Sequence, residues 1–454
     1  MPERLDVRSH AAIRWPLFMV LAAALVAVSL LAGLWVHAGP PAEARPAEQM
    51  GLLAAGDLQS HSTAVLTETQ IFLPLVTACR LQGATLTAPA DPGTIGFTHT
   101  FTVEVPGPNV ALPLTYRWQA TGHEPVVHSA GLTDTLDLLW ELTGSQVITV
   151  QVSNGGCTVP LTVAFDVTTR GLIVFESKPT PGSEQHDLML VHNEYPGVIV
   201  NLTNTPDVDE GGPTWSPDGN WIAYSAGDLS NWNRAIYKID LGTRQVYTVT
   251  EHAGDDRWPA WSPDGTRIAF MRNQPGIPAG YYIPDIWVMD VDGGSQQQLT
   301  DWDYGDEHPA WSPDGQSIAF VSDRYYAGRD LWLMDADGSN QRQILDTPGS
   351  DEVYPTWGPE EWIYYTWRVV DGKDEQLYRM NPDTGAYVKV FSDNLNRYIA
   401  SFAPAGQCFS FYSILGDAAG GDKEVWKWCE GYTTPINLTD NNLSDEYSAW
   451  SPVP

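Results

Sequence analysis

The sequence predicts an all-β protein: a six-bladed β-propeller preceded by a small β-sandwich and an N-terminal transmembrane helix. Three observations carry this prediction. A Trp-Ser-Pro-Asp-Gly repeat returns at nearly constant spacing through the second part of the 454-residue chain. Short segments of alternating hydrophobicity precede the repeats, as in a sandwich of antiparallel strands. An uncharged apolar stretch near the N-terminus is typical of a membrane span.

The composition is that of a folded and strongly acidic protein. Hydrophobic residues make up 43% of the chain and aromatic residues 11%, with 19 Trp, so there is ample apolar surface for more than one core. The formal net charge is -32. Because such a surface repels phosphate, it argues against nucleic acid or anionic lipid as a partner and favours cations or basic polypeptides.

The N-terminus sets the expected location. Residues 1–14 contain three arginines, and residues 15–38 are uncharged, rich in Leu, Ala and Val, and long enough to span a bilayer at ~1.5 Å per residue. We therefore expect a cytoplasmic N-terminus, a single-pass anchor in the cell membrane and a periplasmic or extracellular remainder. A signal peptide cleaved after Val36-His37-Ala38, which would give a secreted protein, is the alternative.

A linker and a sandwich follow the predicted anchor. Residues 39–78 are rich in Pro, Ala, Glu and Thr, a composition typical of a flexible spacer. Residues 79–169 contain alternating segments separated by Gly, Pro and Asn, which predict a small β-sandwich. The expected strands are residues 84–88, 98–105, 114–120, 133–140, 146–152 and 161–167.

Two segments of this region resemble the PKD family of immunoglobulin-like domains. They are Tyr116-Arg117-Trp118 and residues 144–154. The family usually places an acidic, Gly-rich turn after its Trp, whereas this chain has Gln119-Ala120-Thr121-Gly122. The resemblance implies an Ig-like sandwich for residues 79–169.

The repeats are the strongest pattern in the chain. In the motif Pro213-Thr214-Trp215-Ser216-Pro217-Asp218-Gly219, Pro presets φ and Gly accepts a positive φ, so a tight turn follows the Trp strand. The aromatic positions lie 46, 50, 46, 45 and 48 residues apart, which is the period of a four-stranded blade. These positions are Trp215, Trp261, Trp311, Trp357, Phe402 and Trp450.

Counts of two further strand types give the number of blades. Second strands are expected around residues 173, 222, 268, 318, 363 and 409, and third strands around residues 188, 236, 286, 331, 377 and 425. Both counts give six blades for residues 170–454. The sequence ends on an inner strand at Ser448-Ala449-Trp450, which we expect to complete the first blade and close the ring.

Over residues 171–454 these repeats resemble those of the TolB-like propeller family, with WD-repeat-like motifs of the Pro-Asp type. The resemblance implies a six-bladed propeller that mostly binds proteins. In TolB an α/β domain precedes the propeller, whereas this chain has the predicted sandwich there. For that reason the particular partners of TolB are not carried over.

Acidic pairs precede five of the six expected inner strands. Because these positions lie at one mouth of a propeller channel, the pairs would form a negative ring suited to Ca²⁺ or a basic peptide. Alternatively, they hold the blades in register by pairing with residues such as Arg257 and His308. We favour the structural role, and both roles are compatible. The candidates are Asp209, Glu210, Asp255, Asp256, Asp306, Glu307, Asp351, Glu352, Asp445 and Glu446.

The chain has four cysteines, all on the expected exported side, where disulfides persist. Cys79 and Cys157 fall at the two ends of the predicted sandwich, and Cys408 and Cys429 flank a hairpin of the last predicted blade. Their positions predict two structural disulfides. The spacing matches no zinc motif, and the sequence assigns no metal ligand.

These features predict a non-enzymatic, membrane-anchored binding or scaffold protein that uses its propeller for a protein or peptide. The alternative is a propeller enzyme of lyase or glycosidase type, assisted by a metal, acting on envelope or extracellular carbohydrate. Propeller hydrolases with similar repeats need a Gly-x-Ser-x-Gly elbow, and the sequence has none. We assign no catalytic residue, and Ca²⁺ is the one candidate ion.

Overall fold

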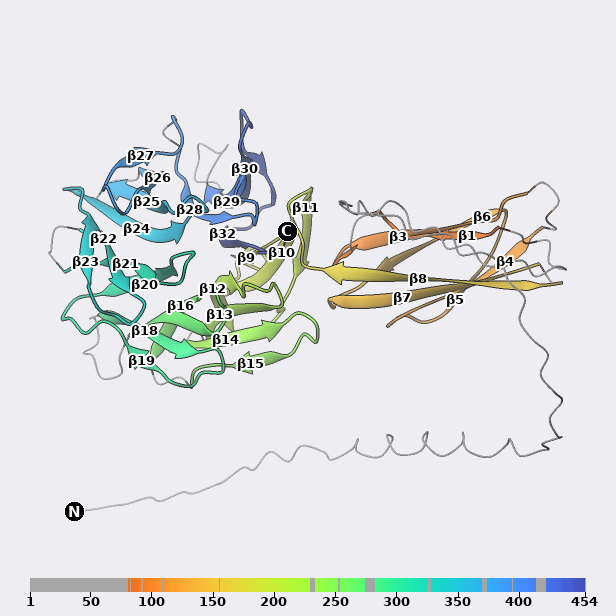
Figure 1. The fold of residues 1–454 in the computed structure, drawn as a ribbon, viewed down its shortest axis with the longest axis horizontal. Coiled ribbons are helices and arrows are strands. Elements are labelled where there is room, and N and C mark those ends of the chain that lie inside the picture. The colour runs from red at the N-terminus through yellow and green to blue at the C-terminus, as the bar shows by residue number, and fades with distance from the viewer. Residues whose placement is uncertain are drawn as a thin grey trace, which may run out of the picture. The chain divides into compact units, whose positions relative to one another are not determined.

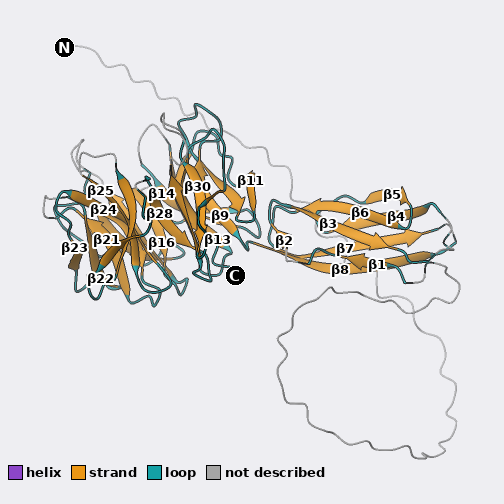
Figure 2. Cartoon of the chain, turned by 90° about the horizontal axis from the view of Figure 1, so that it is seen from above, coloured by secondary structure: helices purple, strands orange, loops and turns teal. Residues whose placement is uncertain are grey.

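The computed structural model describes residues 81–453 with short gaps. The predicted anchor (15–38), the predicted linker (39–78) and Cys79 lie outside the described residues. Within the described part, strands and loops make up the whole chain (Figure 2), and no helix there has the length and apolar character needed to cross a membrane. The gaps are residues 82, 91–92, 108–109, 111, 155, 229–232, 252–253, 274–281, 325–327, 370–373, 394 and 414–421.

The first described region forms two β-sheets. One sheet has the order β1-β3-β6 and consists of β1 (Thr85–Thr87), β3 (Thr98–Glu104) and β6 (Thr133–Leu139). The other has the order β2-β8-β7-β4-β5 and consists of β2 (Gly93–Thr94), β4 (Leu114–Ala120), β5 (Val126–Ala130), β7 (Gly144–Ser153) and β8 (Thr158–Thr168). The six predicted strands are all present, whereas β2 and β5 were not predicted.

Buried and exposed residues alternate along the strands of this region, which explains why they form half-buried sheets. In β4, Leu114, Tyr116 and Trp118 are fully buried and the residues between them are exposed, which is the period of a half-buried strand. The buried polar groups are satisfied, because Trp118 Nε1 donates to Asp134 at 2.7 Å and Tyr116 donates to the carbonyl of Gly131 at 2.8 Å. Cys157 is disulfide-bonded.

Six sheets of four antiparallel strands follow, the number that both strand counts predict. Figure 1 shows them arranged around a centre, with β16, β20 and β24 toward the inside and β15, β19 and β27 toward the outside. The first sheet contains β9 (Leu172–Ser177), β10 (Asp187–His192), β11 (Tyr195–Asn201) and β32 (Asp445–Trp450). The second contains β12 (Asp209–Trp215), β13 (Trp221–Gly227), β14 (Ala235–Asp240) and β15 (Val246–Thr248).

In the remaining four sheets, as in the second, the strands follow in chain order from the inside to the outside. The third contains β16 (Asp255–Trp261), β17 (Arg267–Asn273), β18 (Pro284–Asp290) and β19 (Gln297–Gln298). The fourth contains β20 (Asp306–Trp311), β21 (Ser317–Ser322), β22 (Asp330–Asp335) and β23 (Arg342–Leu345). The fifth contains β24 (Ser350–Trp357), β25 (Ile363–Val369), β26 (Glu375–Met380) and β27 (Tyr387–Lys389). The sixth contains β28 (Tyr398–Phe402), β29 (Cys408–Ser413), β30 (Glu424–Cys429) and β31 (Ile436–Asn437).

The last strand of the chain closes the ring. β32 pairs with β9, so that Trp450 lies opposite Ile173 in the first sheet. The repeat tryptophans then join successive sheets, because the Nε1 of Trp215 donates to Ala449 O at 2.9 Å and the Nε1 of Trp311 donates to Ala260 O at 3.1 Å. The predicted closure is therefore present.

Every inner strand contains a β-bulge that the sequence did not predict. The pairing with the second strand shifts just before the repeat aromatic, for example between Arg257 and Ala260. The residue inside the bulge has a positive φ, 54° at both Trp258 and His308. Because a bulky residue rarely adopts this conformation, the position is constrained by its surroundings.

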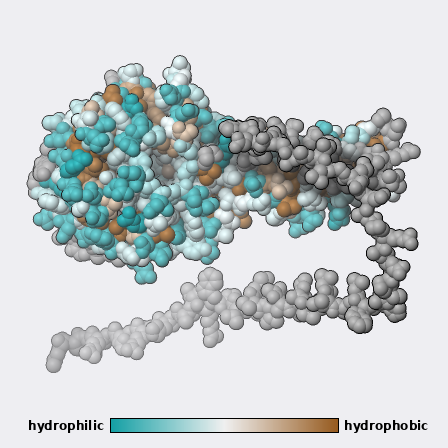
Figure 3. Space-filling model, in the orientation of Figure 1, coloured by the Kyte–Doolittle hydropathy of each residue, from teal (hydrophilic) through white to brown (hydrophobic). Residues whose placement is uncertain are grey.

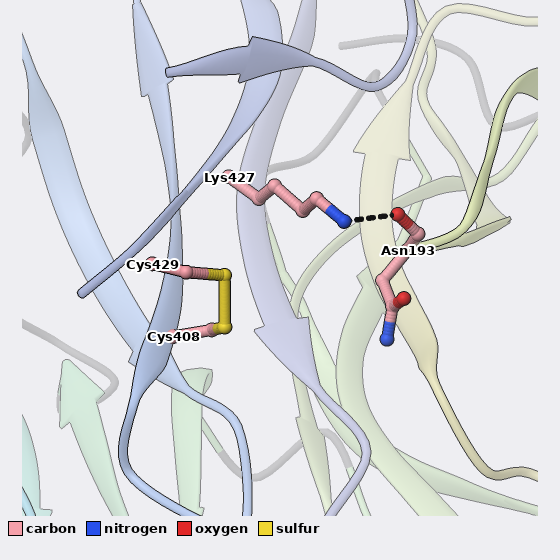
Figure 4. Close-up of a disulfide and its surroundings, with 4 residues drawn as sticks. All are labelled: Asn193, Cys408, Lys427 and Cys429. Carbon is pink, nitrogen blue, oxygen red and sulfur yellow. Dashed lines mark hydrogen bonds between the residues drawn. A yellow bond between two sulfur atoms is a disulfide. The ribbon is translucent and has the colours of Figure 1, made fainter. Parts of the chain in front are cut away.

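Two links hold the last sheet. Cys408 and Cys429 lie opposite one another on β29 and β30 and form the predicted disulfide (Figure 4). Lys427 lies on the same strand as Cys429, and its ammonium group donates to the carbonyl of Asn193 at 2.6 Å. The second link joins the last sheet to the first, because Asn193 follows β10.

We expect Trp450→Ala to open the ring. Its side chain is only 6% exposed, so the cavity and the loss of β32 packing should lower the free energy of unfolding by about 3 to 5 kcal/mol. Urea unfolding followed by circular dichroism measures the change. Tyr387→Ala is the control, because Tyr387 is 52% exposed on the outer strand β27 and its removal should change stability by less than about 0.5 kcal/mol. Equal losses in the two variants would contradict the closure role.

Replacing both Cys408 and Cys429 by Ala should lower the free energy of unfolding by about 3 kcal/mol, since a loop of 21 residues is no longer closed in the unfolded chain. Chemical unfolding of the variant and the native chain under non-reducing conditions measures this difference. An unchanged midpoint would show that the bond contributes nothing to the stability of the last sheet.

Candidate functional site

The propeller has two faces, defined here by the strand ends. The inner strands begin at the loop face and end at the repeat face, where the Ser-Pro-Asp-Gly turns lie. The second and third strands are joined at the loop face, in most sheets by longer connections than these turns; β17, for instance, ends at Asn273 and β18 begins at Pro284. Connections of this kind often carry the binding residues of a rigid scaffold.

The bulges bring four rings together, which we call the ring cluster: Trp258, His308, Tyr354 and Tyr447. The ring centroids of Trp258 and Tyr447 are 4.6 Å apart, and those of His308 and Tyr354 are 4.3 Å apart. The hydroxyls of Tyr354 and Tyr447 are 3.2 Å apart, within hydrogen-bonding distance. Rings from four different inner strands therefore meet where the strands converge.

His308 is held neutral within this cluster. Burial, together with the nearby guanidinium groups of Arg329 and Arg368, lowers the pKa of His308 to about 3. A neutral imidazole avoids placing a third positive charge beside these arginines. His308 is therefore a packing group of the cluster at ordinary pH rather than a cationic one.

Carboxylates and cations surround the cluster at the loop-face side. Glu446 accepts from Lys423 at 2.8 Å, and Glu307 lies 3.4 Å from Arg329. Glu176, on β9, accepts from the main-chain N of Gly212 at 2.9 Å. Burial raises the pKa of Glu176 to about 7, and the nearby Glu446 adds to the rise.

A cavity of about 390 Å³ lies on the other side of the ring cluster. All four cluster residues line it, together with the Pro and Trp residues of the repeats, including Pro263 and Pro313 at the repeat face. No charged side chain lines it. The ring cluster thus separates a charged loop-face mouth from an uncharged cavity at the repeat face.

The acidic pairs are not equivalent to one another in register. Glu210 lies opposite Ala226, which is four positions after Ile222 on the second strand. Glu352 lies at the equivalent position of its own sheet. In two sheets the pair is shifted by one position, so that Asp306 and Asp445, rather than Glu307 and Glu446, match Glu210. The pairs therefore do not form one uniform ring of carboxylates.

Three of the acids cap the neighbouring blade, and we call them cap residues: Asp209, Asp255 and Asp351. Asp351 accepts from the main-chain N of Arg329 at 3.0 Å, while the N of Glu352 donates back to Arg329 O at 2.6 Å. The same reciprocal pair of bonds joins Asp209 and Glu210 to His186. These contacts hold successive sheets together.

The next position holds a buried charged residue in all six sheets; five of these residues lie in the inner strand, and Arg397 directly precedes β28. We call this set the junction residues, and each is at most 2% exposed. Five are acids and one is an arginine. They are Glu210, Asp256, Asp306, Glu352, Arg397 and Asp445.

Cations neutralise many of the predicted site residues. Asp256 accepts from Arg272 at 2.6 and 2.8 Å, and Asp306 accepts from Arg324 at 2.7 Å. Among the described residues, no group of three or more His, Cys, Asp or Glu side chains is arranged to hold a metal ion. Further ion pairs are Arg234–Asp209, Arg257–Asp255, Arg329–Glu307, Arg368–Asp351 and Lys423–Glu446.

Sequence reasoning missed Glu176 and the four residues of the ring cluster. The cluster had a signal, because each of its members stands three residues before the repeat Trp. Without the bulge, strand alternation does not bring these side chains together. Glu176 had no such signal, since it lies on a second strand and approaches the site only through ring closure.

The closed ring of four-stranded sheets has the fold of a TolB-like β-propeller. The chain is similar to TolB from Acinetobacter baumannii, with 19% identity and a TM-score of 0.50 over 69% of this chain and 81% of that one. It is also similar to hydrazine synthase of Kuenenia stuttgartiensis, with 16% identity and a TM-score of 0.51 over 62% of this chain and 46% of that one. At these identities the likeness shows the fold alone. The sequence matches no protein-family model and no curated protein.

Arg272→Met should be strongly destabilising, because it leaves Asp256 buried without its cation. Asp256 is fully buried and the arginine side chain is 6% exposed, so we expect a loss of about 3 to 5 kcal/mol. Arg379→Met is the control; its pair with Glu360 is 39% and 38% exposed and should contribute less than about 1 kcal/mol. Thermal and urea unfolding measure both, and similar effects would contradict a structural role for the junction pair.

Proposed function

We propose that this protein is a non-enzymatic binding or scaffold protein held outside the cytoplasmic membrane. Its parts are an N-terminal anchor, a spacer, a PKD-like sandwich and a six-bladed propeller that recruits a protein or peptide. The disulfide between Cys408 and Cys429 supports an oxidising, extracytoplasmic location. The uncharged, Leu- and Ala-rich segment 15–38 supports the anchor.

The observation that carries the proposed function is the charged mouth above the ring cluster. Glu176 and Glu446 lie opposite one another in the first sheet, and Glu307 lies in the fourth. Together with Arg329 and Lys423, these acids lie beside one aromatic floor. Several charges of both signs on rigid strands can orient a polypeptide by electrostatic complementarity. The rings beneath them give a ligand segment an apolar surface on which to rest.

The charge balance favours a basic partner. The whole chain carries a formal net charge of -32, which attracts a positively charged polypeptide over distances of about 10 Å at moderate salt. The side of the propeller seen in Figure 3 is mostly hydrophilic, as in a surface that meets a polar partner. The solved structures similar to this chain include both TolB and enzymes, so the fold by itself favours neither class.

Affinity capture with the full chain tests this proposal. A partner enriched by the native chain should lose at least about tenfold in affinity with Glu307→Gln plus Glu446→Gln, since each removes a charge at the mouth. Asp292→Asn plus Asp337→Asn is the matched control, because it removes two exposed carboxylates from hairpin turns at the repeat face. Circular dichroism verifies that both variants are folded.

Capture is repeated with calcium and with a chelator. Binding that needs calcium would indicate that the mouth holds the ion as well as the peptide. Binding that weakens steeply with salt would indicate that charge complementarity holds the peptide. The proposal fails if no partner is enriched and the same preparation cleaves envelope or extracellular polysaccharide. That result would support the alternative of a propeller enzyme.

A further inference from the structure

Each junction residue faces the start of the third strand in the preceding sheet. At four of the six junctions its main-chain N donates to the carbonyl of the residue just before that start, for example Asp445 to Lys423 O at 2.7 Å. Arg397 N donates instead to Glu375 O, in the first residue of β26. The first inward residue of each third strand, which we call the facing residue, is buried as well. The facing residues are Asp187, Ala235, Asp285, Asp330, Gln376 and Glu424.

The junctions differ in how they neutralise the buried charge. Where the facing residue is Ala235, Asp256 pairs with Arg272. Where it is Gln376, the junction residue is Arg397, which pairs with Asp393. These two junctions therefore contain one acid and one cation each, as burial of charge requires.

Three junctions instead bring two carboxyl groups together without a described cation bound to either. They are Asp187 with Glu210, Asp330 with Glu352, and Glu424 with Asp445. The fourth carboxyl pair, Asp285 with Asp306, differs because Arg324 binds Asp306 at 2.7 Å. We call the first three sets the carboxyl junctions.

At the closing junction, Asn441 contacts both acids. Its main-chain N donates to Glu424 at 3.0 Å, and its side-chain N donates to Asp445 at 2.7 Å. The other titratable groups nearby are the carboxylates of Asp422 and Asp440, and the adjacent Lys423 is paired with Glu446.

The junction of Asp330 with Glu352 also uses neutral hydrogen-bond donors. Gln343 donates to Asp330 at 2.8 Å, and Ser350 donates to Glu352 at 2.9 Å. The surrounding titratable groups are the carboxylates of Asp346 and Asp351 and the phenol of Tyr365. The nearby arginines pair elsewhere: Arg368 with Asp351 and Arg329 with Glu307.

The junction of Asp187 with Glu210 also uses neutral donors. Asn201 donates to Asp187 at 2.7 Å, and Thr205 donates to Glu210 at 2.8 Å. Tyr224 faces Glu210, and the neighbouring His186 and Arg234 both bind the carboxylate of Asp209.

One buried carboxylate oxygen at each carboxyl junction has no hydrogen-bond partner. These atoms are Asp187 Oδ1, Glu352 Oε2 and Asp445 Oδ1, on residues that are at most 1% exposed. A buried acceptor without a donor is costly, and two ionised carboxylates side by side are costlier still. A proton bound to one acid of each pair removes both costs, because it cancels a charge and supplies a donor.

We propose that the three carboxyl junctions each hold one bound proton. These protons stabilise the propeller, so its stability falls as the pH of the surrounding medium rises. The proton belongs to the pair rather than to either residue. Burial, with the neighbouring Asp445, raises the pKa of Glu424 to about 7. Burial, with Asp422, raises the pKa of Asp445 to about 6. Burial likewise raises the pKa of Glu210 and Glu352 to about 7.

The direction of the pH dependence follows from these pKa values. In the unfolded chain these acids titrate near pH 4, so between about pH 4 and pH 7 the folded state holds more protons than the unfolded state. Stability therefore falls as pH rises through this window and is flat above it. Below about pH 4, protonation of the ion-paired acids opposes folding.

The melting temperature of the full chain, measured from pH 5 to pH 8, tests the proposal. We expect a fall on the order of 10 °C across this range. A triple variant, Glu210→Gln, Glu352→Gln and Glu424→Gln, supplies a fixed neutral donor at each pair and should show a much smaller fall. The remaining fall comes from Glu176 and Asp285, because burial raises the pKa of each to about 7 as well. If the triple variant does not fold, the same comparison is made with Glu424→Gln alone, which should remove part of the fall.

Two controls separate this effect from general charge repulsion. Glu430→Gln removes an exposed carboxylate from the same sheet and should leave the pH profile unchanged. Asp256→Asn breaks an ion pair and should lower the melting temperature equally at pH 5 and pH 8. A direct readout is the infrared band of protonated carboxylic acids, which should be present in the native protein at pH 6 and weaker in the triple variant.

Two results would overturn the proposal. One is a triple variant whose melting temperature falls with pH as much as that of the native chain. The other is a native chain at pH 8 that calcium stabilises and a chelator destabilises, with the triple variant insensitive to both, because the junctions would then hold a cation instead of a proton.

Discussion

The pairing of β32 with β9 is the contact on which the rest of the propeller depends. It places the last strand of the chain in the first sheet and leaves no inner edge open. Because Trp215 donates to Ala449, the second sheet is also fixed by this closing strand. The last sheet is linked to the first near this contact as well. The disulfide joins β29 to β30, and Lys427 on β30 donates a hydrogen bond to Asn193 O.

The junctions between sheets show one physical problem with several solutions. A charged residue is buried in or directly before each inner strand, and a buried charge needs compensation. Arg272 compensates the negative charge of Asp256. In the sixth sheet the signs are exchanged, and Asp393 compensates the positive charge of Arg397. The carboxyl junctions use neutral donors and, in our proposal, a proton, so the stability of the ring depends on the pH of the surrounding medium.

The bulge that shapes the inner strands also shapes the site. By turning Trp258, His308, Tyr354 and Tyr447 toward one another, it closes the space where the strands converge. The carboxylates above this floor lie on strands, and Arg329 and Lys423 directly precede β22 and β30. Such a mouth suits recognition of a partner by charge and shape, which is the basis of the proposed binding function.

The sequence by itself determined the strands, their grouping and their number. Repeat spacing gave six inner strands, alternation gave the six main strands of the first region, and cysteine spacing gave the bond between Cys408 and Cys429. These features are local, since periodicity and turn residues act over a few positions. The predicted anchor and linker lie outside the described residues and stay predictions.

Only the tertiary structure decided how the acids are used. Asp209-Glu210 and Asp306-Glu307 look alike in sequence, yet they differ by one position in register, and a shift of one residue in a strand sends a side chain to the other face. Glu176 reaches the mouth only because residues far apart in sequence meet when the ring closes. Register and bulges depend on the pairing of neighbouring strands, which no local pattern encodes.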